Sequence, residues 1–152
     1  MQELIQLKEL NSKMKKYIAD TNFILRYLLA DNKKQCEQAK VIFEEARTGK
    51  CQIEIEQSVL AEIIFVLSSF YEIPTEEIAR ILKSLLTYKG IKTDFDYYSN
   101  ALDIYLENGV HIVDAIIAAK SIAENTDVLT FDKKLQNVIS DFISKGINSD
   151  ES

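Results

Sequence analysis

The sequence predicts an α/β fold, a sandwich rich in helix in which parallel strands are flanked by helices. Short apolar or alternating segments, which suit strands, are separated by longer segments with helical periodicity. This alternation favours parallel strands joined by right-handed crossovers. The chain has 152 residues, 47% of them hydrophobic, which suffices for one domain with its own core.

Two strands are expected in the first half of the chain. Residues 16–19 form a short apolar segment that suits a buried strand, and residues 21–31 follow with helical spacing. Residues 33–48 place their apolar side chains on one helical face. Residues 51–56 alternate with period two, which is typical of a strand. An apolar helix is expected from Ser58, a suitable N-cap residue, to Tyr71.

The second half of the chain continues the alternation. Residues 75–88 follow a proline and carry two glutamates in their first turn, as helix N-termini often do. Residues 90–93 suit a weak strand. Helices are expected over residues 95–108 and 110–125, and a strand is expected over residues 127–130.

The expected domain covers residues 15–144. Residues 1–14 form a helical or disordered extension, and a further hypothesis is that translation starts at Met14. Residues 145–152 are polar and suit a tail.

Charge and composition limit the function classes. The chain has 18 Lys and Arg against 24 Asp and Glu, a net charge of −6, which argues against broad electrostatic binding to nucleic acid. A single histidine and two isolated cysteines argue against a zinc site. No apolar run is long enough for a membrane span, and no secretory signal is evident. Cys36 and Cys51 are therefore expected to be reduced thiols of a cytoplasmic protein.

Four acidic residues occur in apolar surroundings, where an uncompensated charge is costly. Asp20 follows the first expected strand, and Asp132 follows the last clear one. Glu62 and Asp114 lie in or near the first turns of two strongly apolar helices. Because open α/β sheets bind ligands beyond the carboxyl ends of their strands, we expect these four residues, here called the acidic quartet, to meet at one edge. An all-oxygen site of this kind suits Mg²⁺ or Mn²⁺.

Each carboxylate also has a local explanation. Asp20 could cap the following helix, and Asp114 could complement a helix dipole. Asp132 could belong to a turn, and Glu62 could project from the rim of its helix. The joint occurrence of all four favours the metal site over four separate caps.

Four segments resemble the successive blocks of PIN-domain ribonucleases, most closely the VapC-type toxins of toxin–antitoxin pairs. They read YIADTNFILRYLLAD, SVLAEIIFVL, GVHIVDAIIAA and VLTFDKKL, and the resemblance runs from about Lys16 to Leu135. The acidic quartet stands in the order and context of the family's acidic residues.

The resemblance implies that the acidic quartet holds Mg²⁺ or Mn²⁺ in an endoribonuclease site, where a metal-activated water hydrolyses the phosphodiester bond. The products would carry 3′-hydroxyl and 5′-phosphate ends. Thr21 and Thr130 match positions whose hydroxyls support such a site, and Asn22 is expected to fix the backbone of its turn. The resemblance also implies a three-layer sandwich around a parallel sheet of about five strands. It further implies an RNA substrate, a small antitoxin partner and a homodimer.

One position departs from the family pattern. Many relatives carry an acidic residue three positions before the one that matches Asp114, and His111 stands there in this chain. A catalytic base and a capping or packing residue are the two alternatives for His111.

Basic residues near the expected site could contact RNA phosphates. They are Arg26, Lys33, Lys34, Lys133 and Lys134. Arg26 and Lys133 are the predicted substrate-binding residues. The alternative for any one of these side chains is an ordinary solvated charge.

Two other functions compete with the nuclease. A catalytically silent PIN-like module would bind protein or RNA, but loss of acidic ligands would mark it, and this chain keeps all four. A phosphotransfer enzyme could use Asp20 as an acyl-phosphate nucleophile. That pattern has a second aspartate two residues later, where Asn22 stands.

Overall fold

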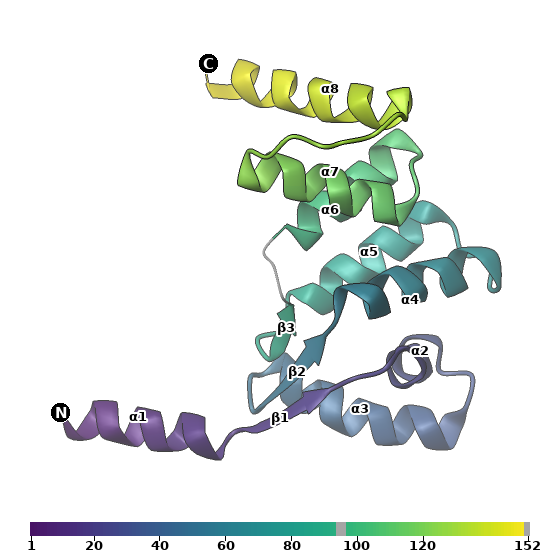
Figure 1. Ribbon diagram of the computed structural model, residues 1–152. Coiled ribbons are helices and arrows are strands. Elements are labelled where there is room, and N and C mark those ends of the chain that lie inside the picture. The colour runs from purple at the N-terminus through teal and green to yellow at the C-terminus, as the bar shows by residue number, and fades with distance from the viewer. Residues whose placement is uncertain (94–96, 151–152) are drawn as a thin grey trace. The chain divides into compact units, whose positions relative to one another are not determined.

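The structure is a computed structural model that describes residues 1–93 and 97–150. Figure 1 shows its helices and strands in chain order. The chain divides into two compact units. Unit 1 comprises the chain up to Val66 and the stretch from Ser84 through the third strand, and unit 2 comprises Leu67–Lys83 and the chain from Tyr97 onward.

Unit 1 contains the sheet. Its elements are α1 (Gln2–Lys13), β1 (Lys15–Ile18), α2 (Thr21–Leu29), α3 (Lys33–Arg47), β2 (Cys51–Ile55), most of α4 (Gln57–Ser69) and β3 (Ile91–Thr93). The strands pair in parallel in the order β1-β2-β3 (Figure 1). Tyr17 of β1 is in register with Ile53 of β2, which is in register with Ile91 of β3.

Aromatic rings hold α2 against α3. Phe43 of α3 is fully buried and stacks on Tyr27, with ring centroids 4.2 Å apart, and on Phe23, with centroids 6.0 Å apart. The Tyr27 hydroxyl forms a 2.7 Å hydrogen bond with the Tyr88 hydroxyl, and burial raises the pKa of Tyr27. The first helix pair is therefore fixed by a packed aromatic cluster, which positions the turn between β1 and α2.

Unit 2 is helical. Its elements are most of α5 (Thr75–Leu86), α6 (Tyr98–Asn108), α7 (Ile112–Glu124) and α8 (Lys133–Asp150). α7 packs against both α6 and α8 (Figure 1). Lys83 of α5 and Asp103 of α6 form an ion pair, in which the ammonium group donates a hydrogen bond to the carboxylate. Gly109 ends α6 in the left-handed conformation, with φ +60°.

The predicted fold class is confirmed, because a parallel sheet flanked by helices is present. The following predicted segments form the expected element, with ends shifted by a few residues: helices over 21–31, 33–48, 58–71, 75–88, 95–108 and 110–125, and strands over 16–19, 51–56 and 90–93. The predicted start of α6 at residue 95 lies in 94–96, outside the described residues.

Three local predictions are wrong. Residues 127–130 form no strand, so the sheet has three strands in the described part of the chain, and Leu129 is fully exposed. Among residues 1–93 and 97–150, no strand pairs with the segment between α7 and α8. β1 is not buried, since Ile18 remains 73% exposed. Ser58 is not an N-cap, because α4 already begins at Gln57.

The two ends of the chain are helical where they are described. α1 covers most of the predicted extension, and Leu4, Ile5 and Leu7 are exposed on it. α8 continues to Asp150, into the predicted tail. Both cysteines are free thiols, as predicted. Within residues 1–93 and 97–150, no helix has the length and apolarity that a membrane span requires.

Candidate metal centre

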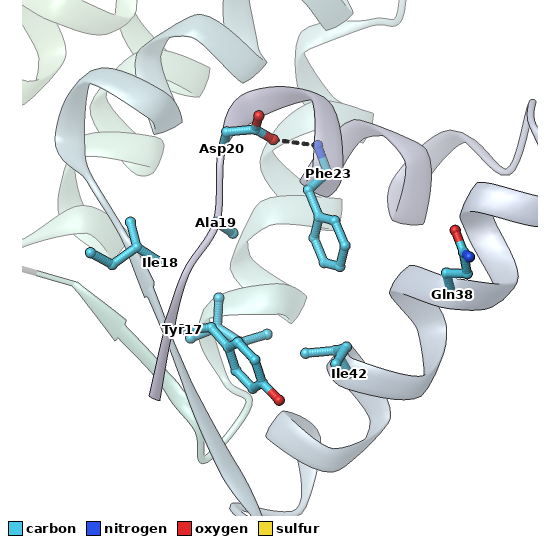
Figure 2. A pocket seen from close by; sticks show the side chains of 8 residues that line it. Tyr17, Ile18, Ala19, Asp20, Phe23, Gln38 and Ile42 are labelled. Carbon is cyan, nitrogen blue, oxygen red and sulfur yellow. Dashed lines mark hydrogen bonds between the residues drawn. The ribbon is translucent and has the colours of Figure 1, made fainter. Parts of the chain in front are cut away.

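Asp20 stands at the turn where the chain passes from β1 into α2. The turn is anchored to the sheet by the Ala19 amide, which donates a 3.2 Å hydrogen bond to the Glu54 carbonyl. Asp20 is the N-cap of α2, and its Oδ1 accepts a 2.8 Å hydrogen bond from the Phe23 amide (Figure 2). The capping explanation for this carboxylate is therefore correct. It uses one of the two carboxylate oxygens.

Glu62 reaches the same turn from α4. The Thr21 hydroxyl donates a 2.7 Å hydrogen bond to Glu62 Oε2, although the two residues are 41 positions apart in the sequence. Thr21 directly follows Asp20 in the sequence. One threonine is therefore bonded covalently to Asp20 and by a hydrogen bond to Glu62, two members of the acidic quartet. Both carboxylates belong to unit 1 and both residues are exposed. Glu62 is the sixth residue of its helix and so lies just beyond the first turn, because α4 begins at Gln57.

Asp132 lies in unit 2, directly before α8. Its Oδ1 accepts hydrogen bonds from the backbone amides of Lys134, at 2.9 Å, and Leu135, at 3.4 Å. Its own amide donates a 3.0 Å hydrogen bond to the Thr130 hydroxyl. Asp132 therefore caps α8 rather than ending a strand, and Thr130 supports the backbone at this position.

Asp114 lies in the first turn of α7, as predicted, and is half-buried. The beginning of α8 is tied to the turn before α7, because Lys134 Nζ donates a 3.1 Å hydrogen bond to the Gly109 carbonyl. His111 occupies the N-cap position of α7, but its exposed side chain makes no capping hydrogen bond. His111 is thus the N-cap residue by position, although its side chain does not bond to the helix.

The acidic quartet has the donor chemistry of a hard-cation site. Asp20 and Asp132 each use Oδ1 for a helix cap, and Glu62 uses Oε2 for Thr21. The second oxygen of each of these carboxylates, and the whole carboxylate of Asp114, has no hydrogen-bond or ion-pair partner in the described chain. Carboxylate oxygens are the ligands that Mg²⁺ and Mn²⁺ prefer.

The two units each contribute two members of the quartet. Among the described residues, no group of three or more His, Cys, Asp or Glu side chains is gathered so that it could hold a metal ion. Within unit 1 the structure thus brings Glu62 to Thr21, the residue next to Asp20, while Asp114 and Asp132 stand at helix N-termini within unit 2.

The predicted substrate-binding residues differ in their environment. Arg26 is held by two nearby side chains. Its Nε donates a 3.2 Å hydrogen bond to Asn22 Oδ1, and its NH1 forms a 2.5 Å ion pair with Asp31 Oδ1. Asn22 Oδ1 thus holds the Arg26 side chain, and a role of Asn22 in fixing the turn backbone stays a prediction. Lys133 is exposed at the start of α8.

Sequence reasoning missed the polar side chains that α3 presents toward this site. Gln35 and Gln38, one helical turn apart, line a hollow together with Asp20. Their spacing of three residues on a predicted helix was the available signal. Asp31, the ion-pair partner of Arg26, was missed because it lies in the loop between α2 and α3, where no periodicity indicates which side chains meet.

Comparison with known proteins gives one family match. The family described as PIN domain matches residues 17–139, which is more than half of the chain. The matched region contains the whole acidic quartet. No curated protein matches the chain.

Proposed function

Because the chain belongs to the PIN-domain family, whose members are typically nucleases, we propose that it is a metal-dependent endoribonuclease that hydrolyses RNA phosphodiester bonds. The family match supports a nuclease fold in general. The metal, the RNA cleavage and the biological role proposed below rest on the site residues and on the resemblance of the sequence segments.

We propose that the acidic quartet holds the ion, Mg²⁺ or Mn²⁺. When bound, such an ion polarises the scissile phosphate and lowers the pKa of a coordinated water. The chain's own residues would position that chemistry. The Thr21 hydroxyl fixes the orientation of Glu62, and the α2 cap fixes Asp20. Thr130 and the first amides of α8 hold Asp132 in the same manner.

The observation that carries the proposal is the hydrogen bond between Thr21 and Glu62. It places a second carboxylate at the β1–α2 turn, although sequence separation alone gives no reason for the two to meet. A carboxylate at the rim of a helix needs no such partner. Metal-ligating carboxylates, in contrast, are commonly held by hydrogen bonds from neighbouring groups.

We further propose that the nuclease is the VapC-like toxin of a toxin–antitoxin pair, that it forms a homodimer and that a small antitoxin neutralises it. These finer assignments are supported by the four resembling segments. Expression of the wild-type chain in a bacterial host should arrest growth, and expression of Asp20→Asn should not. Equal growth with both chains would reject the toxin role while leaving ribonuclease activity open to its own test.

The ribonuclease proposal is tested by cleavage of a mixed RNA pool with added Mg²⁺ or Mn²⁺. Asp20→Asn and Asp114→Asn should each lower the cleavage rate by more than about a hundredfold, the upper range for groups that only support metal ligands. Asparagine can still cap α2, so loss of the charge is separated from loss of the cap at Asp20. Asp141→Asn, on the exposed surface of α8, is the matched control and should cleave like wild type.

Activity that persists in both substitutions would overturn this mechanism. A wild-type chain that binds RNA without cleaving it in either metal would favour the catalytically silent binding module.

A further inference from the structure

A small polar hollow lies between α2 and α3 in unit 1, directly beside Asp20. Its volume is about 240 Å³, and it is lined by Asp20, Asn22, Phe23, Arg26, Gln35 and Gln38. It shares Asp20, Phe23 and Gln38 with a larger, mostly apolar hollow of about 620 Å³ next to β1 (Figure 2). Pockets for drug-sized ligands are usually about 300–1,000 Å³, so the smaller hollow suits a group the size of one nucleobase.

The α3 wall of this hollow carries two amide side chains. Gln35 and Gln38 stand three residues apart and thus on the same helical face. Both residues are exposed, and neither side-chain amide has a hydrogen-bond partner in the described part of the chain. A carboxamide presents two donors and an acceptor side by side, which is the pattern that pairs with the hydrogen-bonding edge of a base.

The α2 wall carries two planar groups, and both are held in place. The Phe23 ring is half-buried and is backed by Phe43, with an angle of 27° between the ring planes. The Arg26 guanidinium is held by Asn22 and Asp31. Unpaired RNA bases stack on aromatic rings and on guanidinium planes, and are read through their hydrogen-bonding edges. One hollow thus combines both elements of single-base recognition.

We propose that this hollow binds one unpaired base of a single-stranded RNA, and that Gln35 and Gln38 read its edge. The proposal rests on the proposed ribonuclease function, because Asp20 then places the scissile phosphate next to the hollow. The base would belong to a nucleotide adjacent to the cut. Phe23 and Arg26 would provide the flat surfaces, and the two glutamines would provide selectivity among bases.

The test compares cleavage-site preferences on a randomised single-stranded RNA with Mg²⁺. The wild type should prefer certain bases at one position next to the cut. In the double variant Gln35→Ala/Gln38→Ala, the preference among bases should fall about tenfold at that position and nowhere else. Tenfold is about the ratio that one net hydrogen bond provides. Glu37→Ala, an exposed residue on the same helix that does not line the hollow, should leave the preference unchanged.

A second measurement separates this proposal from the nuclease proposal. Binding of equal-length oligo(A), oligo(C) and oligo(U) is measured in a metal-chelating buffer. The wild type should bind the three oligonucleotides with different affinities, and Gln35→Ala/Gln38→Ala should bind them with equal affinities. Cleavage with an unchanged base profile in the double variant would overturn the base site alone. Discrimination that depends on the glutamines in a chain that does not cleave would overturn the nuclease alone. A wild type that discriminates in neither assay would overturn the base site.

Discussion

Thr21 connects the carboxylates of Asp20 and Glu62, which lie far apart in the sequence. Its hydroxyl donates to Glu62 Oε2 at 2.7 Å, while its backbone begins α2 directly after the Asp20 cap. The threonine thus acts on Glu62 through a single hydrogen bond and on Asp20 through the covalent chain. This makes Thr21 a positioning residue for both acids in unit 1.

Replacing Thr21 with valine removes the hydroxyl but keeps the shape of the side chain. We expect Thr21→Val to lower the rate of RNA cleavage by roughly 10–100-fold and to raise the Mg²⁺ concentration needed for half-maximal rate, because the hydrogen bond that supports Glu62, a proposed metal ligand, is lost. Thr21→Ser, which keeps the hydroxyl, should restore both values. Rates and metal titrations like those of the wild type in Thr21→Val would show that Glu62 needs no such support.

At the scale of single elements, the beginning of α8 allows a helix cap to be separated from a metal ligand. Asp132 caps α8 through Oδ1, and asparagine caps helices about as well as aspartate. Asp132→Asn should therefore unfold at nearly the wild-type temperature but lose cleavage. Asp132→Ala should lose cleavage and also about 1 kcal/mol of stability, because the cap is gone. Calorimetry with parallel cleavage assays measures both effects, and full activity in Asp132→Asn would remove this residue from the site.

The contact between α3 and the sheet depends on the absence of a side chain at Gly90. Its amide donates a 2.7 Å hydrogen bond to the Ala46 carbonyl, and a Cβ here would clash with the carbonyl oxygens of Cys51 and Ala46. Both are backbone atoms that cannot turn away. We expect Gly90→Ala to destabilise the protein by about 1–3 kcal/mol or more. Gly146→Ala on α8 is the control, because its Cβ meets nothing within 4 Å and should be neutral or slightly stabilising. Equal melting temperatures for the two variants would contradict this packing.

The sequence predicted well those elements whose own residues carry a clear strand or helix periodicity. β2 alternates buried and exposed side chains, and α3 buries Ala39, Phe43 and Ala46 at helical spacing. Residues 127–130 show the limit, because a strand also requires a partner with matching backbone groups, and local sequence does not specify one. Asp20 shows another limit: its cap uses one carboxylate oxygen, so capping and the proposed metal binding do not exclude each other.

At the scale of the whole molecule, the net charge of −6 leaves little general attraction for RNA. Two of the basic residues that were candidates for contacting RNA phosphates already have partners within the chain. Arg26 forms an ion pair with Asp31, and Lys134 donates a hydrogen bond to the Gly109 carbonyl. A divalent ion in the acidic quartet would offset part of the negative charge where a phosphate has to approach. Binding of the ion and of the substrate are therefore expected to be coupled.

The same reasoning predicts that the metal stabilises the folded chain. Two members of the quartet lie in unit 1 and two in unit 2, so one substitution in each unit tests whether both pairs contribute to the proposed ion binding. Mg²⁺ or Mn²⁺ at a hundred times its dissociation constant should add about 2.7 kcal/mol to the free energy of unfolding, which raises the melting temperature of a chain of this size by several degrees. Glu62→Gln in unit 1 and Asp114→Asn in unit 2 should each abolish the rise, whereas Asp141→Asn should retain it. Differential scanning fluorimetry with and without metal measures this without any RNA. If the rise disappears in Glu62→Gln but persists in Asp114→Asn, the ion is bound by unit 1 alone and the four-carboxylate site is wrong.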